Sequence, residues 1–224
     1  MLKRLPIFFF VVACLVNLGA WIMGQPAIAA MVKPALMPLL SIACVASALD
    51  FRVDSRRLGL LVGAQLFGCA GDILLIGSGF PFFASGIGAF LIGHIFYLTL
   101  FGSKSWKGMS WKVWLVSLPI MLACVWGLVK VLKVSGALLP PMAVYGMMLM
   151  LLIFCTLCGL IRYRDKATWS FLFFGAIMFT MSDSLIAVQT FEVFEIPQLH
   201  FIIMFTYLLA QSLLAIGGFR LCKK

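Results

Sequence analysis

The chain has 224 residues, of which 64% are hydrophobic and only 11% are charged, whereas a soluble globular domain carries about 25% charged residues. Its formal net charge is +10, but the basic residues lie in short segments between apolar runs, a pattern that indicates membrane orientation and contact with anionic lipid. The composition therefore excludes a soluble fold and argues against nucleic-acid binding. We expect residues 1–224 to form a single transmembrane domain.

Apolar runs of about twenty residues recur along the whole length, and each is long enough to cross a bilayer as a helix but too long for a barrel strand. The predicted fold class is all-α, a polytopic membrane helix bundle. Segments rich in glycine, proline or charge separate the runs. We expect eight transmembrane helices, at roughly 5–24, 32–50, 58–78, 82–103, 113–133, 138–161, 167–190 and 200–220.

The first apolar run resembles a secretory signal, because Lys3 and Arg4 precede it and the sequence AIAA follows at 27–30. The run from Leu5 to Met23 is longer than the apolar core of a usual signal, however. We therefore expect a retained first helix.

The distribution of charge predicts the orientation. With an even number of spans, both termini lie on one side, and that side holds 14 of the 17 basic residues, which leaves only Lys33, Lys130 and Lys133 opposite. The positive-inside rule makes the basic side cytoplasmic. The sequence thus predicts cytoplasmic termini in a multi-pass protein, and we expect it in the inner (cytoplasmic) membrane of a bacterium.

The seven cysteines indicate packing rather than chemistry, because six of them fall inside apolar runs. Cys155 and Cys158 form a CxxC within a predicted helix, but no histidine or further cysteine lies nearby to complete a metal site. The sequence therefore predicts neither a disulfide framework nor a metal site.

Two aspartates lie in the middle of predicted helices: Asp72 in CAGDILL and Asp183 in TMSDSLIA. An ionisable side chain in the bilayer core costs at least ~2.5–3.5 kcal/mol, so the pair is the first candidate for a functional site. At a rise of 1.5 Å per residue from the cytoplasmic side, both lie roughly 20 Å up, past the midplane toward the outer face.

Other polar residues are expected near this depth. Lys33 is expected to open the second helix on the outer side, and Tyr145 and Tyr207 lie about two turns into helices that descend from that side. We expect these three in one layer with the two aspartates. His94 and Tyr97, on the fourth predicted helix, are expected nearer the midplane or below it.

The spacing of these residues also hints at an internal duplication. Asp72 and Asp183 are 111 residues apart, and Lys33 and Tyr145 are 112 apart, which is half the chain in each case. Two parallel four-helix halves would produce such an offset.

Five segments occur in a fixed order: VKPALMPLL at 32–40, AGD at 70–72 followed by ILL, GAFLIGHIFY at 88–97, MSDSLIA at 181–187 and YLLAQ at 207–211. Together they resemble the YhhN-type lysoplasmalogenase family of eight-helix membrane proteins, over most of the chain from Lys33 to Gln211. One departure is the segment Gln65–Leu66–Phe67, where a small hydroxylated residue would be expected.

The resemblance implies hydrolysis of the vinyl-ether bond of lysoplasmalogens. The products would be a fatty aldehyde and glycerophosphoethanolamine or glycerophosphocholine, and no metal or organic cofactor is implied. Such a reaction begins with protonation of the β-carbon, which gives an oxocarbenium ion that water captures. It therefore needs an acid that is still protonated at neutral pH.

Burial in a medium of low dielectric and a neighbouring carboxylate both favour the protonated form of a carboxyl group. Asp72 and Asp183 therefore suit the roles of a protonated acid and its ionised partner, as paired carboxylates do in glycoside hydrolysis. The sequence makes either residue eligible for either role.

The predicted substrate-binding residues surround this pair. Lys33 is expected to meet the substrate phosphate as a point charge, and His94 is expected to carry protons or to orient a carboxylate. The remaining candidates would donate hydrogen bonds to phosphate, glycerol or water, or lie within the matched motifs: Tyr97, Tyr145, Ser182, Tyr207 and Gln211.

The partner that this reading implies is a lysophospholipid within the bilayer, with no nucleic acid and no obligatory protein partner. Two alternatives stay open at this point. The first is a secondary transporter whose buried carboxylates bind protons or sodium, although the chain lacks obvious broken helices. The second is a purely structural subunit of a membrane complex.

Overall fold

The computed structural model describes residues 5–77, 79–107 and 109–224. Eight helices in this part of the chain are long and apolar enough to cross a membrane, which confirms the predicted all-α polytopic bundle of an integral, multi-pass membrane protein. A short 3₁₀ turn, η2 (Gly136–Leu138), precedes the sixth helix. The helices are α1 (Leu5–Ile22), α2 (Pro26–Ala48), α3 (Ser55–Leu74), α4 (Phe80–Ser105), α5 (Trp111–Val131), α6 (Leu139–Arg162), α7 (Lys166–Thr190) and α8 (Leu199–Cys222).

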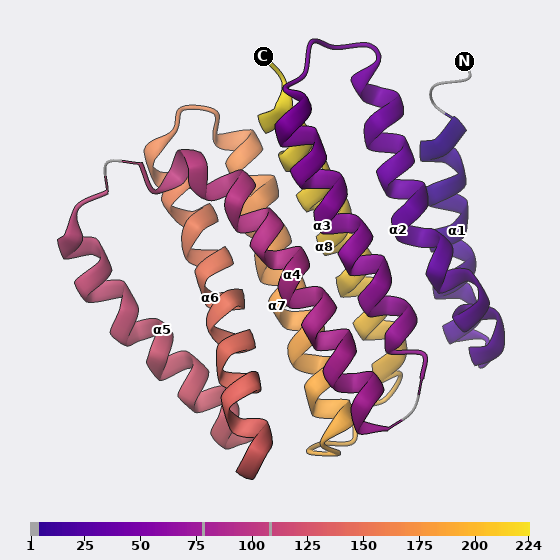
Figure 1. Cartoon of the computed structure of the whole chain (residues 1–224). Helices are drawn as coiled ribbons and strands as arrows, with labels where there is room; N and C mark the ends of the chain where they lie inside the picture. Colours follow the sequence, from indigo (N-terminus) through magenta and orange to yellow (C-terminus); the bar gives the residue numbers. More distant parts are fainter. Residues whose placement is uncertain (1–4, 78, 108) are drawn as a thin grey trace.

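Figure 1 shows α1 and α2 at one edge of the bundle, α5 at the other edge, and α3, α4, α7 and α8 between them. The closest associations are α7 with α8 and α3 with α4. The helix α1 begins and α8 ends at the same end of the bundle. We call this the basic end, because its loops carry most of the lysines and arginines, and we call the other the opposite end.

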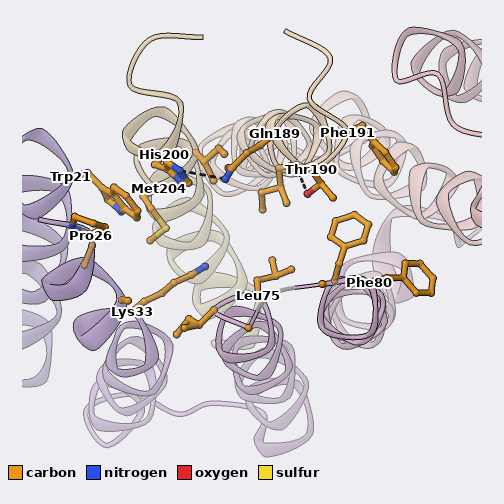
Figure 2. A pocket seen from close by; sticks show the side chains of 18 of the residues that line it. Trp21, Pro26, Lys33, Leu75, Phe80, Gln189, Thr190, Phe191, His200 and Met204 are labelled. Carbon is orange, nitrogen blue, oxygen red and sulfur yellow. Dashed lines mark hydrogen bonds between the residues drawn. The ribbon is translucent and has the colours of Figure 1, made fainter. Parts of the chain in front are cut away.

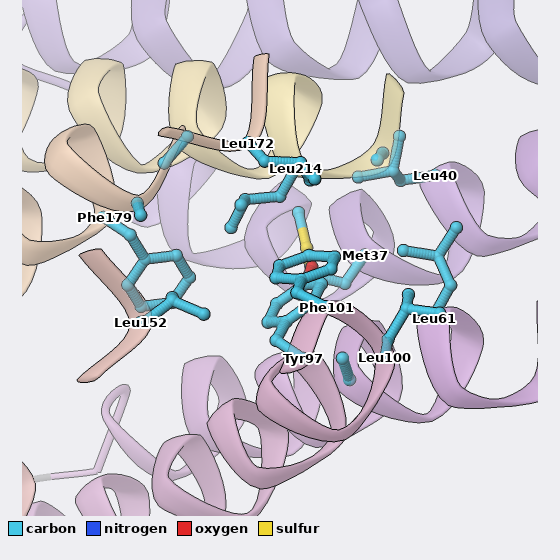
Figure 3. Close-up of a cluster of buried hydrophobic side chains, with 14 of the residues drawn as sticks. Met37, Leu40, Leu61, Tyr97, Leu100, Phe101, Leu152, Leu172, Phe179 and Leu214 are labelled. Atoms are coloured by element: carbon cyan, nitrogen blue, oxygen red, sulfur yellow. The ribbon is translucent and has the colours of Figure 1, made fainter. Parts of the chain in front are cut away.

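Small residues allow the central helices to approach closely. A Cβ atom on Gly93 of α4 would lie 3.1 Å from the Ala64 carbonyl oxygen of α3, and one on Gly217 of α8 would lie 3.1 Å from the Thr168 carbonyl oxygen of α7. Around these contacts a cluster of buried side chains fills the interior, with Met37, Leu40, Leu61, Tyr97, Leu100, Phe101, Leu152, Leu172, Phe179 and Leu214 among its members (Figure 3). The polar site described below is therefore held on a rigid, well-packed scaffold.

The two helices that carry the buried aspartates begin in the same way. Asp54 is the N-cap of α3, and its carboxylate accepts hydrogen bonds from the backbone N–H groups of Arg56 and Arg57. Asp165 is the N-cap of α7 and accepts from the N–H of Thr168 at 3.2 Å. An aspartate N-cap satisfies donors that the first helical turn leaves free.

The ends of the second and third helices differ from the prediction. The α2 helix begins at Pro26, six residues before the predicted start, because proline suits the first helical position. Lys33 therefore lies about two turns inside α2 rather than opening it. The α3 helix spans Ser55–Leu74 instead of 58–78, and Asp72 consequently lies within its last turn at the opposite end.

Candidate active site at the opposite end of the bundle

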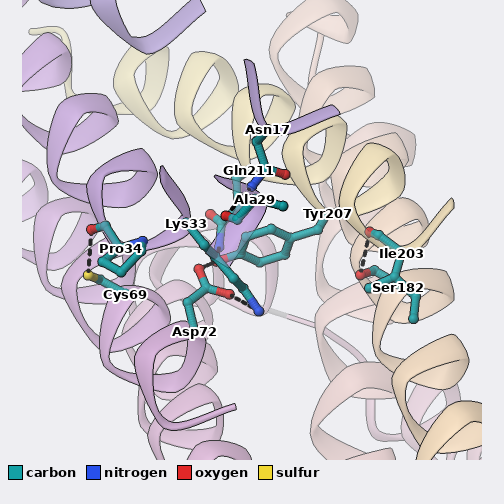
Figure 4. A network of polar contacts seen from close by, with 10 residues as sticks. All are labelled: Asn17, Ala29, Lys33, Pro34, Cys69, Asp72, Ser182, Ile203, Tyr207 and Gln211. Carbon is teal, nitrogen blue, oxygen red and sulfur yellow. Dashed lines mark hydrogen bonds and ion pairs between the residues drawn. The ribbon is translucent and has the colours of Figure 1, made fainter. Parts of the chain in front are cut away.

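Asp72 lies in the first of two buried polar clusters and is 2% exposed. One carboxylate oxygen forms an ion pair with the Lys33 ammonium from α2, with an Nζ–Oδ1 distance of 3.4 Å. The other accepts a hydrogen bond of 2.7 Å from the Tyr207 hydroxyl of α8 (Figure 4). Both oxygens are thus engaged, one of them with a cation, an environment that stabilises the ionised carboxylate.

A chain of hydrogen bonds fixes the direction of the Tyr207 hydroxyl. The Tyr97 hydroxyl donates to Oε1 of Gln211 at 2.8 Å, and Nε2 of Gln211 donates to the Tyr207 oxygen at 3.4 Å. Because Tyr207 already accepts from Gln211, its own proton is directed at Asp72. Tyr97 and Gln211 therefore position Tyr207 and do not line the cavity described below.

The helix α2 is fastened to α3 beside this ion pair. Pro38 has no N–H group, so the carbonyl of Pro34 lacks its helical partner. The Cys69 thiol of α3 donates to that carbonyl at an S–O distance of 3.4 Å (Figure 4). This contact ties together the two helices that carry Lys33 and Asp72.

Asp183 forms the second cluster, and its carboxyl group is bound on one side only. The Tyr145 hydroxyl of α6 donates a short hydrogen bond to Oδ2 of Asp183. Its Oδ1 atom is buried and has no hydrogen-bond partner among the described residues. An unpaired buried oxygen is far more costly on a carboxylate than on a neutral acid, so this environment favours the protonated form.

His94 lies beside the second cluster, closer to it than its expected depth suggested. Its ring contacts those of Tyr145 and Phe179, with centroid distances of 5.7 and 4.7 Å. Nδ1 lies 2.7 Å from the carbonyl oxygen of Phe90, and because a carbonyl only accepts, we assign the proton to Nδ1. Nε2, which is buried and unpartnered in the described structure, is then an available acceptor.

Aromatic rings connect the two clusters. The Phe179 ring lies 5.7 Å from that of Tyr207, and the Phe90 ring lies 6.2 Å from both Phe179 and Tyr207. The structure thus brings together the two aspartates with Lys33, Tyr145 and Tyr207, as the sequence predicted, and adds His94, which was expected nearer the midplane or below it. Ser182 is directed elsewhere, because its hydroxyl donates to the carbonyl of Ile203 at 3.2 Å.

A cavity of about 630 Å³ opens above these clusters at the opposite end (Figure 2). Its walls differ in character. Polar side chains of α1, α2, α7 and α8 form one wall: Trp21, Lys33, Gln189 and His200. Apolar side chains of α4, η2 and α7 and of the segment after α3 form the other, among them Leu75, Phe80, Phe83, Leu138 and Ile186.

A small inner void of about 20 Å³ lies between the cavity and the second cluster, and Asp183 and Tyr145 contribute to its lining. A void of this size has room for about one water molecule. Leu75, Phe83 and Ile186 line both the cavity and the void. These three apolar side chains are therefore the partition between the cavity and Asp183.

The comparisons with known proteins agree with this architecture. The profile of the YhhN family matches residues 28–218, which is most of the chain. The chain belongs to the YhhN family. No group of three or more side chains able to hold a metal ion occurs among the described residues of this YhhN protein.

Curated relatives of this YhhN protein carry the name lysoplasmalogenase TMEM86B. The mouse (Mus musculus) protein is 30% identical over 214 residues, covering 94% of this chain and 85% of the relative. The human (Homo sapiens) protein is 29% identical with the same coverage, and the pig (Sus scrofa) protein is 30% identical over 96% of this chain and 86% of its own length. No solved structure matches the chain significantly.

Three residues of the polar wall were not predicted from the sequence of this YhhN protein: Trp21, Gln189 and His200. Each lies at the end of a helix, where polar and aromatic residues are common at any membrane boundary. His200 is one of only two histidines in the chain, which was the available signal. Its place beside Lys33 depends on how α8 packs against α2.

Proposed function

We propose that this YhhN protein is a membrane-embedded lysoplasmalogenase, which hydrolyses the vinyl-ether bond of lysoplasmenyl-ethanolamine or lysoplasmenyl-choline to a fatty aldehyde and the glycerophospho-base. The observation that carries the proposal is the unequal pair of buried carboxyl groups beneath a cavity with one polar and one apolar wall. Similarity to relatives named lysoplasmalogenase supports the same reaction.

Asp183 is the proton donor in this proposal. Its unpartnered Oδ1 lies at the inner void and carries the proton, while Tyr145 holds the other oxygen in place. A vinyl ether that displaces the apolar partition brings its β-carbon to Oδ1. Proton transfer to that carbon leaves Asp183 as a carboxylate and the substrate as an oxocarbenium ion.

Asp72 supplies the negative charge that stabilises this cation. Lys33 and Tyr207 keep it ionised before the reaction begins, so no reorganisation is needed as the positive charge develops. Water then adds to the oxocarbenium carbon, and a carboxylate accepts the proton that the water loses. Collapse of the hemiacetal returns a proton to the glycerol oxygen and releases the aldehyde.

Lys33 lines the cavity while it is paired with Asp72. An ammonium has three donors, so Lys33 binds Asp72 and an oxygen of the substrate phosphate at the same time. Only the lipid is required as a partner. With the basic end facing the cytoplasm under the positive-inside rule, the cavity opens toward the outer leaflet, and we place the protein in a bacterial inner membrane.

The test is aldehyde release by purified protein from a lysoplasmenyl lipid, with the ester lysolipid of the same chain length as a control. Asp183→Asn removes the proton donor and should lower kcat by about 10²–10⁴-fold. Asp165→Asn is the matched control, because asparagine also caps helices and this residue lies outside the site. Unchanged aldehyde release by Asp183→Asn would refute the mechanism, and no release by the wild type would refute the function.

A further inference from the structure

The polar wall of the cavity contains groups that neither aspartate uses. The His200 ring stacks on the Trp21 indole, with a centroid distance of 4.5 Å and an interplanar angle of 4°. Nε2 of Gln189 lies 3.4 Å from Nε2 of His200 (Figure 2). Because an amide nitrogen only donates, we assign this imidazole nitrogen as the acceptor. The other ring nitrogen, Nδ1, then carries a proton available for donation.

On the side of His200 that faces the cavity, the nearest charged group is positive. The Lys33 ammonium lines the same cavity as His200. His200 also lies in the first turn of α8, which contains no acidic residue, and Gln198 caps that helix without a side-chain hydrogen bond. The N-terminal end of a helix carries a partial positive charge. Two sources of positive potential, the Lys33 ammonium and the first turn of α8, thus lie on one wall.

The next charged side chains, farther from the catalytic pair, are negative. A further hollow of about 840 Å³ shares Trp21, Gln189 and His200 with the cavity and adds Glu192 and Glu195 to its lining. Charges along the path from the catalytic pair outward therefore run from the Asp72 carboxylate to the cationic wall and then to the two glutamates. A vinyl-ether lipid with a zwitterionic head group presents the complementary order, from oxocarbenium to phosphate to ammonium.

We propose that His200, stacked on Trp21 and oriented by Gln189, forms with Lys33 the subsite for the phosphodiester of a zwitterionic lysolipid. This inference rests on the proposed function and deepens it by assigning the head group to the α1–α2–α8 side of the cavity. The hydrocarbon chain then lies against the apolar wall, on the side of Phe80 and Leu138. We assign the subsite to a lipid phosphodiester rather than to free phosphate. Only the lipid carries an ammonium that can pair with the two glutamates of the outer hollow.

The test uses binding, so that it does not depend on turnover. The probes are a saturated 1-alkyl ether of glycerophosphoethanolamine, which has no vinyl group to hydrolyse, the 1-alkylglycerol of the same chain length, and inorganic phosphate. Dissociation constants are measured by titration calorimetry on the whole protein in detergent micelles. His200→Phe keeps a ring on Trp21 but removes the N–H donor, while His200→Gln keeps a donor.

We expect His200→Phe to weaken binding of the phospho-ether by about tenfold, the range for loss of a hydrogen bond to a charged group, and to leave alkylglycerol binding unchanged. His200→Gln should restore part of the loss. The control is Phe205→Leu, an exposed residue of α8 that lines neither the cavity nor the outer hollow and should leave both affinities unchanged.

Three outcomes would overturn the subsite: an unchanged preference for the phospho-ether in His200→Phe, an equal loss for both lipids, or tight binding of inorganic phosphate alone. Failure of the proposed function gives a different result. In that case the wild type and His200→Phe still differ in phospho-ether affinity, but neither releases aldehyde from the vinyl-ether lipid.

Discussion

The α3 and α7 helices begin alike and end differently. Each starts at an aspartate N-cap, 18 residues before its buried aspartate (54 to 72 and 165 to 183). However, α3 ends at Leu74, two residues after Asp72, whereas α7 continues to Thr190, seven residues after Asp183. Asp72 consequently lies at the end of its helix, where it meets the ammonium of Lys33. Asp183 is covered by two further helical turns and by the apolar partition.

The partners of the two aspartates follow the same arrangement. In each case the preceding helix supplies one, Lys33 from α2 and Tyr145 from α6. One partner is a cation and the other is a neutral hydroxyl, so equivalent positions acquire opposite preferences for the proton. The equal offsets agree with the predicted four-plus-four repeat, which stays a prediction. The difference teaches that the partner each aspartate meets, rather than its depth in the membrane, separates the acid from its counter-ion.

The largest expected contrast is in stability. Asp72→Asn leaves the Lys33 ammonium without its counter-ion and should lower the free energy of unfolding by up to about 3–5 kcal/mol, the range for breaking a buried pair. Asp183→Asn breaks no ion pair and should cost less than about 1 kcal/mol, because the amide oxygen still accepts from Tyr145. Unfolding in mixed micelles measures both. The double variant Lys33→Met/Asp72→Asn should recover stability without activity, and equal losses in the two single variants would contradict the comparison.

The two tyrosines should also differ in how much each contributes to the free energy of unfolding. Tyr207→Phe removes a bond to an ionised carboxylate and leaves the Gln211 amide without its acceptor, a cost of about 1–3 kcal/mol. Tyr145→Phe removes a bond to a protonated acid and should cost only about 1 kcal/mol. Thermal unfolding of the two variants under one detergent condition gives the order. A larger loss for Tyr145→Phe would mean that Asp183 carries the charge.

Chemical labelling can measure the difference in protonation between Asp183 and Asp72 directly. Hydrophobic carbodiimides add to protonated carboxyl groups, so Asp183 should be labelled several-fold faster than Asp72. Ile186→Ala opens the partition and should raise labelling at Asp183 further. Peptide mapping by mass spectrometry locates the adduct, with Ile76→Ala as the matched control, because Ile76 lines the cavity but not the inner void. Preferential labelling of Asp72 would reverse the assignment.

The smallest expected effect lies at the caps. Hydrogen bonds from Thr168, together with Arg220 nearby, lower the pKa of Asp165. A carboxyl whose pKa is lowered on folding adds stability above its unfolded value of about 3.9 and loses it as the pH falls through the folded value. Asp165→Asn should therefore cost less than about 1 kcal/mol at neutral pH, since the group is exposed. The cost should therefore shrink as the pH falls below that unfolded value, and a cost that persists at low pH would reflect a lost cap instead.

The sequence predicted all eight helices. A long apolar run indicates a segment in hydrocarbon, and there the backbone polar groups must bond to one another, as they do in a helix. Helix ends were harder. Leu75 and Ile76 prolong the apolar run beyond Leu74, so hydropathy does not mark where α3 stops. Gly79 is the N-cap of α4, shortly before the proline of its first turn, and its φ of 92° is a backbone conformation that glycine adopts readily.

Both aspartates and Lys33 were predictable, since charged residues in apolar runs stand out. Tyr145 and Tyr207 were expected at the same depth, but which tyrosine pairs with which aspartate was not predictable. Tyr207 is 135 residues from Asp72 in sequence and meets it only through the packing of α8 against α3. The assignment of acid and counter-ion depended on one unpartnered atom, Oδ1 of Asp183. No property of the sequence indicates which of two buried oxygens lacks a partner.

The cavity's two dissimilar walls have a consequence for the fate of the products. Cleavage converts one amphiphile into a water-soluble glycerophosphodiester and a wholly apolar aldehyde chain. With the head group and the chain placed as proposed, the first product leaves on the side of Lys33 and His200, toward water, and the second on the side of Phe80, toward the bilayer. Each product enters the phase in which it is most soluble, so the two no longer share a compartment. Partition between water and lipid then opposes recombination and drives turnover forward without any input of energy.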